Sequence, residues 1–220
     1  MNTLQLRGTF SRGLASVAFG TVINILCPPK RKHKTVVTRL IATASTTAHV
    51  VTCLREIDRT TVTTAVAASG TSITLAKNLG NAPIGPYGSA SQIAADHLAA
   101  NDWYVIELPD GTYFLDYVSA FSTSTLVLTP TGTVPTNGIA AGATVWMLGL
   151  AADLDPFDPV AGAFPGRNIK ASTRVEFPTS AEADAPVFSS YLPYSPLLVQ
   201  DNNATATGTI ELVEGGWVRP

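Results

Sequence analysis

The sequence predicts an all-β protein in which the two ends of the chain form one β-sandwich and the middle forms an inserted small β-barrel, with little helix. Apolar and polar residues alternate in many short runs, which is the pattern of half-buried strands. Turn-forming residues separate those runs, since the 220 residues include 17 glycines and 15 prolines. Four β segments near each end flank a compact β-rich middle. These observations place the sandwich at 1–59 with 150–220 and the barrel at 60–149.

The composition indicates a large core and a neutral surface. Hydrophobic residues make up 45% of the chain and charged residues only 14%, against about 25% in a typical soluble domain. Such a surface suits a protein that packs against copies or partners. The formal net charge of −2 gives no global electrostatic reason to expect nucleic-acid or membrane binding. No apolar run approaches the roughly 20 residues of a membrane helix.

The first strands of the sandwich are expected near the N-terminus. Residues 3–10 alternate weakly and predict an edge strand or an arm. Residues 20–27 predict a clearer strand, which ends at Pro28-Pro29 because two prolines remove two hydrogen-bond donors. The two cysteines, Cys27 and Cys53, are compatible with a disulfide but do not require one, and buried thiols are the alternative.

Two β-branched runs, 35–41 and 49–57, flank a linker of small residues. They predict an antiparallel pair in which Arg39 and Arg55 face outward.

The basic cluster Lys30-Arg31-Lys32-His33-Lys34 lies between the second strand and this pair. One interpretation is a patch that binds phosphate, nucleic acid or an acidic partner. The other is a solvated loop before the next strand. The cluster alone does not decide between them.

The middle of the chain contains the clearest local signal, a β-hairpin over 102–118. Pro109-Asp110-Gly111 predicts its turn, because proline fixes φ, aspartate bonds its own backbone and glycine takes a positive φ. Alternation predicts one apolar face on each arm. The first arm presents Tyr104, Ile106 and Leu108, and the second presents Tyr113, Leu115 and Tyr117. Trp103 and Phe114 are expected on the opposite face from Tyr104 and Tyr113.

Five further segments complete the predicted barrel of five or six strands. Residues 71–76, 125–129 and 143–148 predict strands, 78–91 predicts an exposed loop rich in glycine and proline, and 92–100 predicts a short helix. The hairpin aromatics are expected to form the barrel core, and a sugar- or base-stacking face is the alternative.

The C-terminal part returns to the sandwich. A long irregular connection is predicted over 151–167, followed by strands over 169–177, 197–200 and 207–213. The segment 191–196, Tyr-Leu-Pro-Tyr-Ser-Pro, is an aromatic and proline-rich strap. It suits an extended partner contact because proline lowers the cost of ordering the chain, and a plain loop is the alternative.

No pattern in the chain predicts catalysis or a bound metal. The trio Asp153, Asp155 and Asp158 lacks the glycine and the distal glutamate of a calcium loop. No two histidines lie at i, i+4 and no Cys-x-x-Cys occurs, which disfavours structural zinc. Nucleophile-elbow, P-loop and dinucleotide-binding signatures are absent. We therefore expect neither enzyme activity nor a cofactor.

The short sequence patterns of four stretches resemble those of small virion structural proteins of tailed bacteriophages. These stretches are 61–76, 99–113, 139–149 and 196–211. Alanine-alanine-asparagine-aspartate before a β-run and alanine-alanine-glycine before an apolar strand carry the resemblance. The size and the lack of a long helix are most similar to a capsid decoration (cement) protein. Such a protein stabilises the shell from the capsid surface, at seams between major capsid subunits, and is commonly a homotrimer.

The resemblance implies the major capsid protein as partner, with no nucleic-acid or membrane partner. The arm 1–12, the basic loop and the strap become candidate contacts. The contact residues expected from these segments are Leu4, Leu6, Phe10, Lys30, Arg31, Lys32, Tyr191, Pro193 and Tyr194. A tail, collar or head-fibre component is one alternative. A carbohydrate-binding β module is another, which exposed Trp103 and tyrosine side chains would favour.

Overall fold

A computed structural model describes residues 9–12, 17–18, 24–44, 49–79, 100, 102–150, 167–169, 172, 174–177, 188–190, 192–201 and 207–219. Every element in these ranges is a β-strand, so the all-β prediction is confirmed. The helix predicted over 92–100 lies, apart from its last residue, outside the described residues. No helix among the described residues is long and apolar enough to cross a membrane.

The chain divides into two compact units, which are described separately. Unit 1 contains Met1–Arg55 and Leu150–Pro220, and unit 2 contains Glu56–Gly149. The strand β5 (His49–Thr61) begins in unit 1 and continues into unit 2. Whether each unit folds independently, as the predicted domains 1–59 with 150–220 and 60–149 require, stays a prediction.

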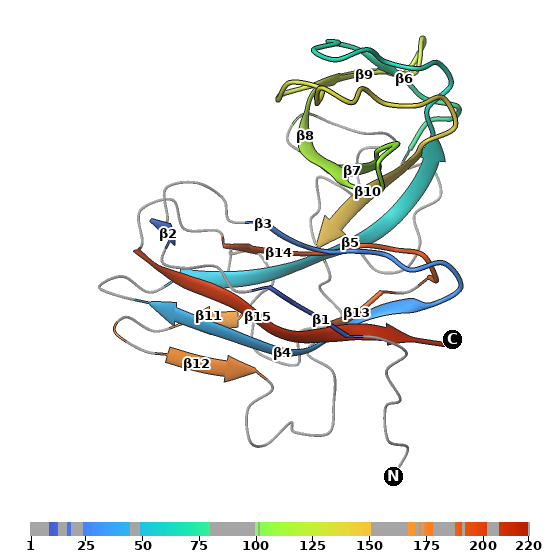
Figure 1. Ribbon diagram of the computed structural model, residues 1–220. Coiled ribbons are helices and arrows are strands. Elements are labelled where there is room, and N and C mark those ends of the chain that lie inside the picture. The colour runs from blue at the N-terminus through green and yellow to red at the C-terminus, as the bar shows by residue number, and fades with distance from the viewer. Residues whose placement is uncertain are drawn as a thin grey trace. The chain divides into compact units, whose positions relative to one another are not determined.

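The first sheet of unit 1 is built on β4 (Lys34–Ala44) and β15 (Thr207–Val218), which lie side by side although they come from opposite ends of the chain (Figure 1). They run antiparallel, from Lys34 opposite Val218 to Ala44 opposite Gly208. Four short strands join this pair. Next to β15 are β1 (Thr9–Arg12) and β2 (Val17–Ala18), and next to β4 are β12 (Arg174–Phe177) and β13 (Phe188–Ser189).

The second sheet of unit 1 places β14 (Leu197–Asp201) between β3 (Asn24–Cys27) and β5, and β11 (Arg167–Ile169) also pairs with β5. All of these pairings are antiparallel. The strands predicted over 20–27 and 197–200 therefore become neighbours. That the two sheets of unit 1 pack as a sandwich stays a prediction.

The predicted antiparallel pair of 35–41 with 49–57 is wrong, because β4 and β5 belong to different sheets. Successive residues of β4 are buried, including Val36 and Val37. Because β4 is covered on both faces, its backbone N–H and C=O groups need hydrogen-bond partners along both edges. β15 and β12, from the C-terminal part of the chain, supply these partners.

The two arginines of the predicted strand pair differ in their exposure to solvent. Arg39 is exposed, as expected, and its Nε lies 2.6 Å from Oε1 of Glu176 on the neighbouring strand. The expectation that Arg55 faces outward is wrong, since only 2% of Arg55 is exposed. Leu54, Arg55 and Glu56 are buried in succession, so both faces of β5 are covered here and period-2 alternation does not identify a solvent face.

Cys27 forms no disulfide. It lies on β3 opposite Leu197, whereas Cys53 lies on β5 opposite Val199. Since β14 separates β3 from β5, and the two cysteines are offset by two residues along the strands, their backbones are at least about 10 Å apart. A disulfide spans at most about 7 Å between Cα atoms, so sheet order excludes this pairing.

Unit 2 is barrel-like. Its strands follow the order β10 (Thr144–Leu150), β7 (Trp103–Glu107), β8 (Tyr113–Ser122), β9 (Val127–Pro130) and β6 (Ile73–Thr74). The segment 61–63 closes the ring. The Thr63 amide donates to Thr74 O at 2.9 Å on one side, and the Val62 amide donates to Ala143 O at 2.9 Å on the other. The core inside the ring includes Val62, Ile73, Tyr104, Ile106, Leu128, Val145 and Met147.

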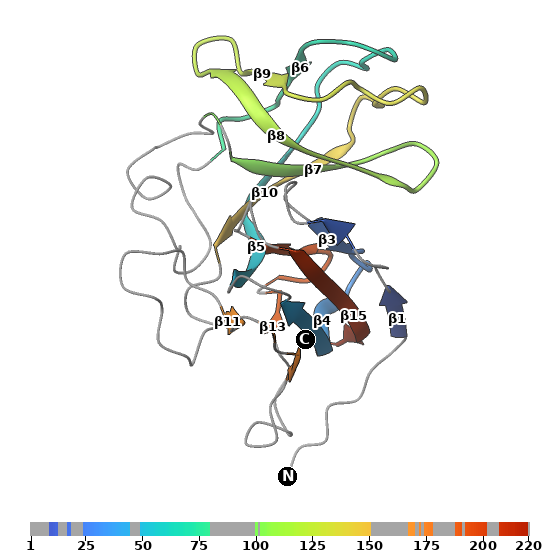
Figure 2. The ribbon, with the colours of Figure 1, turned by 90° about the vertical axis from the view of Figure 1, so that its left-hand side faces the viewer.

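The predicted hairpin is confirmed as β7 and β8, which form the long green ribbon of Figure 2. Its turn closes through the Leu108 amide, which donates to Thr112 O at 2.9 Å, and Gly111 has the expected positive φ of 79°. Tyr104 and Ile106 are buried, as predicted.

The predicted face of the second arm is wrong. The three-residue turn sets a register with Ile106 opposite Phe114 and Tyr104 opposite Asp116. Directly opposed residues share a face, so Phe114 and Val118 enter the core while Tyr117 is 39% exposed. The prediction from hydrophobicity assigned the core face of the second arm to residues one position away from those that face the core. A shift of one residue exchanges the two faces of a strand.

Candidate partner-contact site

The basic cluster forms a tight turn immediately before β4. The His33 amide donates to Lys30 O at 3.1 Å, and the imidazole Nδ1 of His33 lies 2.8 Å from Arg31 O. Lys32 has a φ of 61°, the left-handed value that the third residue of a type II turn requires and that favours glycine. A lysine at this position costs about 1 kcal/mol of backbone strain. The loop is therefore ordered by its own hydrogen bonds.

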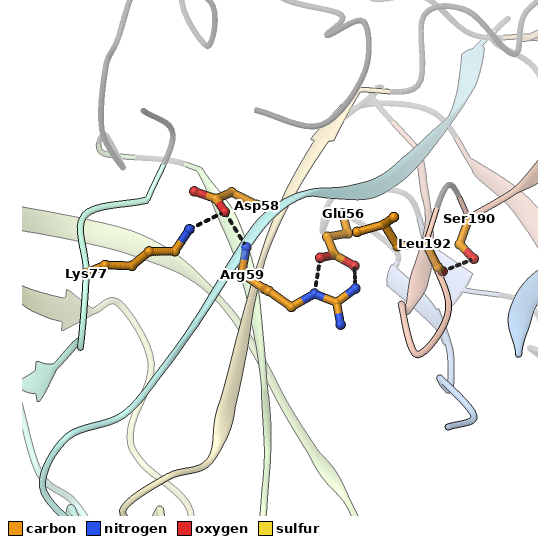
Figure 3. Close-up of polar contacts among 6 residues, drawn as sticks. All are labelled: Glu56, Asp58, Arg59, Lys77, Ser190 and Leu192. Atoms are coloured by element: carbon orange, nitrogen blue, oxygen red, sulfur yellow. Dashed lines mark hydrogen bonds and ion pairs between the residues drawn. The ribbon is translucent and has the colours of Figure 1, made fainter. Parts of the chain in front are cut away.

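The strap binds to the chain just after this turn. The Tyr194 amide donates to His33 O at 2.9 Å, and the Thr35 hydroxyl donates to Ser195 O at 2.7 Å. Ser190 accepts from the Thr35 amide at 3.0 Å and donates to Leu192 O at 3.0 Å, the latter contact shown in Figure 3. Thr35, Ser190 and Ser195 are buried. These bonds attach a segment about 160 residues away in sequence to the start of β4.

Two aromatic rings support the cations of the loop. The ammonium Nζ of Lys30 lies 4.9 Å from the ring centroid of Trp217, and the guanidinium carbon of Arg31 lies 5.0 Å from that of Tyr194. Both distances are within the range of cation–π attraction. The Trp217 ring is itself fixed, because its Nε1 donates to Pro28 O at 3.0 Å.

We call this region the cationic end of unit 1. It combines loop, strap and the last residues of β15, and its members are Lys30, Arg31, Lys32, Lys34, Tyr194, Trp217 and Arg219. The described segments that form it, 28–35, 192–196 and 215–219, contain five lysines and arginines and no acidic residue. The rest of the chain then has nine basic and sixteen acidic residues, a formal charge of −7, although the whole chain carries −2.

The structure brings together five of the predicted contact residues, which are Lys30, Arg31, Lys32, Pro193 and Tyr194. Phe10 lies on β1 opposite Gly215, two residues from Trp217 along β15. Leu4, Leu6 and Tyr191 lie outside the described residues. Whether any of these residues contacts a partner stays a prediction.

Trp217 is the member of the site that the sequence analysis did not select. It lies opposite Thr35 in the β4–β15 pairing, which carries its ring to the basic loop. The only local signal is a tryptophan directly after Gly215-Gly216, and both glycines lie within β15.

The hairpin aromatics of unit 2 serve mainly as core. Tyr104 and Phe114 are buried and pack edge to face, with ring centroids 6.0 Å apart. On the other face, Trp103 packs edge to face on the more exposed Tyr117 at 5.5 Å. One exposed ring in an edge contact provides little of the flat surface that sugar stacking uses.

A buried carboxylate completes the unit 2 core. Asp116 Oδ2 accepts hydrogen bonds from the Tyr104 hydroxyl at 3.1 Å and from the Gly132 amide at 2.8 Å. Burial, and then the neighbouring Asp116 carboxylate, raise the pKa of the Tyr104 hydroxyl well above its usual range. The two hydrogen bonds join the hairpin to the loop that follows β9, which is a structural role.

A second polar group lies at the start of unit 2 (Figure 3). Arg59 contacts both carboxylate oxygens of the buried Glu56, with Nη2 2.7 Å from Oε2. Lys77 Nζ lies 2.7 Å from Oδ1 of Asp58, which is also buried. Both of these buried acids, Glu56 and Asp58, thus have a basic partner. The described residues contain no group of three histidine, cysteine or acidic side chains that could hold a metal ion.

The chain matches no protein-family model and no curated protein significantly. The solved structures that overlay weakly on it include two of capsid proteins of bacteriophage P23-77. The complex of the two major capsid proteins VP16 and VP17 is 10% identical and covers 96% of this chain and 100% of its own, with a TM-score of 0.23. The VP17 structure is 8% identical and covers 98% of each chain, with a TM-score of 0.22. TM-scores this low do not establish a shared fold.

Proposed function

We propose that the chain is a virion structural protein of a tailed bacteriophage that decorates the capsid. It binds on the capsid surface, at seams between major capsid subunits, and stabilises the shell. The cationic end carries the proposal, because two segments expected to be contacts, the loop 30–34 and the described part of the strap, 192–196, lie together as one ordered surface. The stretches that resemble virion proteins, such as 61–76, support the virion assignment.

The composition supports the same proposal. Only 14% of the residues are charged, so much of the surface is suited to packing against other subunits. A decoration protein occupies many equivalent positions, and modest contacts at each add up to firm attachment through multivalency. The cationic end supplies one such contact per copy.

The direct test uses phage shells assembled without this protein. The purified chain is added, the shells are pelleted through a sucrose cushion, and their disruption temperature is measured. We expect the chain to sediment with the shells at a saturating stoichiometry and to raise the disruption temperature. A chain that stays in the supernatant at micromolar concentration would refute the decoration function.

We further propose that the protein is a trimer, and light scattering tests this. A stable trimer has three times the 23.0 kDa of one chain. A larger closed ring would favour the tail or collar alternative, and a monomer in solution and on shells would refute the trimer.

The arm is proposed as a second contact, and deleting residues 1–12 tests it. Among the described strands β1 pairs with β15 alone, and β4 pairs with the other edge of β15, so the deletion should leave the fold intact. We expect the truncated chain to attach more weakly to shells and to keep its circular dichroism spectrum. Attachment equal to that of the full chain would remove the arm from the contact surface.

A further inference from the structure

We propose that the cationic end of unit 1 is a preformed site for an acidic protein surface, which it binds through the carboxylates of that surface. The inference deepens the proposed function, on which it rests for the identity of the partner as a capsid protein. It assigns the partner chemistry and adds Trp217 and Tyr194 as positioning residues.

The first argument is order in the absence of a partner. Flexible lysine and arginine side chains normally lose rotamer freedom on binding, and this weakens exposed ion pairs. Here Lys30 and Arg31 already rest on the rings of Trp217 and Tyr194 at 4.9 and 5.0 Å. Much of the ordering therefore precedes binding.

The second argument is backbone strain on both sides of one hydrogen bond. The Tyr194 amide donates to His33 O, and both Tyr194 and the adjacent Lys32 have left-handed φ values, 57° and 61°. Residues other than glycine hold such values only where the surrounding structure enforces them, and they gather at functional sites. The two strained residues fix the loop against the strap, which sets the spacing of the cations.

The third argument concerns two cations of this end, Arg31 and Lys32, which have no acidic partner among the described residues. Arg31 and Lys32 are exposed, and within the described part of the chain neither forms an ion pair. Elsewhere on unit 1, Arg39 is paired with Glu176 on the same sheet. Two exposed positive charges that no described acidic side chain pairs are suited to a partner of opposite charge.

Carboxylates fit this site better than nucleic acid. Single-stranded nucleic acid and sugars use free aromatic faces for stacking, whereas Lys30 and Arg31 lie over the rings of Trp217 and Tyr194. Duplex binding uses long basic tracts that follow the phosphates, and here the five cations are confined to one end of a chain whose remainder carries −7. A guanidinium matches the planar geometry of a carboxylate and can bind both of its oxygens.

The experiment measures binding of the full chain to fluorescently labelled poly-L-glutamate by anisotropy, with a DNA duplex of equal total charge as competitor. Arg31→Gln tests the site, and Arg174→Gln is its matched control, because it also removes one exposed arginine from unit 1. At low salt we expect Arg31→Gln to weaken binding about two- to fivefold, the range of an exposed ion pair, and Arg174→Gln to weaken it less than about 1.5-fold. The DNA should compete poorly.

A second variant tests the positioning role. Tyr194→Leu keeps every charge and removes the ring beside Arg31. We expect weaker binding with an unchanged dependence on salt, because the number of ionic contacts stays the same. Circular dichroism and the unfolding temperature of each variant verify that unit 1 remains folded.

Equal weakening by Arg31→Gln and Arg174→Gln, or tighter binding to DNA than to poly-L-glutamate, would overturn the inference. Shell attachment separates it from the proposed function. If wild type and Arg31→Gln attach equally well to shells, the inference fails and the decoration function stands. If the chain binds poly-L-glutamate but no shell, the decoration function fails and the acidic-surface site stands.

Discussion

Replacing Gly138 by alanine should destabilise unit 2 far more than the same replacement at Gly142. Both glycines have positive φ values, 64° and 81°, so both replacements introduce the strain of a left-handed alanine. They differ in the space available. A Cβ atom at Gly138 would lie 2.6 Å from the carbonyl oxygen of Val66, whereas a Cβ atom at Gly142 meets nothing within 4 Å.

The size of the expected loss in unfolding free energy follows from the backbone hydrogen bonds between Val66 and Ile139. Its carbonyl accepts from the Ile139 amide at 2.8 Å, and its amide donates to Ile139 O at 2.8 Å. The carbonyl cannot retreat from a new Cβ without breaking this pair of bonds, at about 1 kcal/mol each. Left-handed strain adds about 1–2 kcal/mol, partly offset by about 0.4–1 kcal/mol from a less flexible unfolded chain. We expect a loss of about 3 kcal/mol for Gly138→Ala and about 1 kcal/mol for Gly142→Ala.

Urea unfolding of the full chain, followed by tryptophan fluorescence, measures both variants. Unit 2 contains two of the three tryptophans, Trp103 and Trp146. Gly111→Ala is a second control, because Gly111 also has a positive φ and open space around its Cα atom. If the three variants lose the same free energy of unfolding within about 0.5 kcal/mol, the steric reasoning at Gly138 is refuted.

Two further predictions concern unit 2. Because the pKa of Tyr104 is raised above its unfolded value of about 10, its stabilising contribution is complete below pH 10 and falls by about 1.4 kcal/mol per pH unit above it. The difference in unfolding free energy between wild type and Tyr104→Phe should therefore shrink from pH 9 to pH 12, and a constant difference would contradict the shift. Residues 56–149, expressed alone, should fold cooperatively, since the whole core cluster lies between Val62 and Met147. Non-cooperative unfolding of this fragment would contradict an independent domain.

The parts of the fold that sequence predicted correctly are those with short-range causes. The β7–β8 hairpin follows from alternation on each side of Pro109-Asp110-Gly111, and all of this information lies within 17 residues. The prediction of which face of β8 is buried was wrong, because the register between β7 and β8 depends on the exact number of residues in the turn. A single residue of slip is enough to exchange Phe114 with Tyr113.

The strand pairings of unit 1 show the opposite case. The run at 35–41 is adjacent in sequence to that at 49–57, and short connections usually join paired strands. Yet β4 pairs with β15 over eleven sequence positions, from Lys34 to Ala44. Both alternatives satisfy the same apolar pattern. Nothing local to β4 encodes a partner about 170 residues away, so the choice depends on how the whole sheet buries its faces.

The candidate site combines both kinds of information. Five consecutive residues, 30–34, indicate the basic loop, and the tyrosines and prolines of 191–196 indicate the strap. Their contact is not local, because it depends on the hydrogen bonds of Thr35 and His33 to a distant segment. Trp217 enters only through its register opposite Thr35. Sequence identified the groups, and tertiary structure determined that they form one surface.

The net charge of the chain conceals the property that matters at this surface. A total of −2 gives no reason to expect an electrostatic partner, yet residues 30–34 and Arg219 together carry five positive charges. At physiological salt, charges act over about 8 Å, so a partner at the cationic end responds to the local cluster and hardly to distant acids. Lys34 lies opposite Val218, the residue before Arg219, and Lys30 and Arg31 are held on their rings within the same end. Concentrating like charges in this way raises the free energy of the unbound protein slightly. The acidic partner that we propose would relieve that repulsion on binding, which is why the local charge, and not the total, is the quantity to test at this surface.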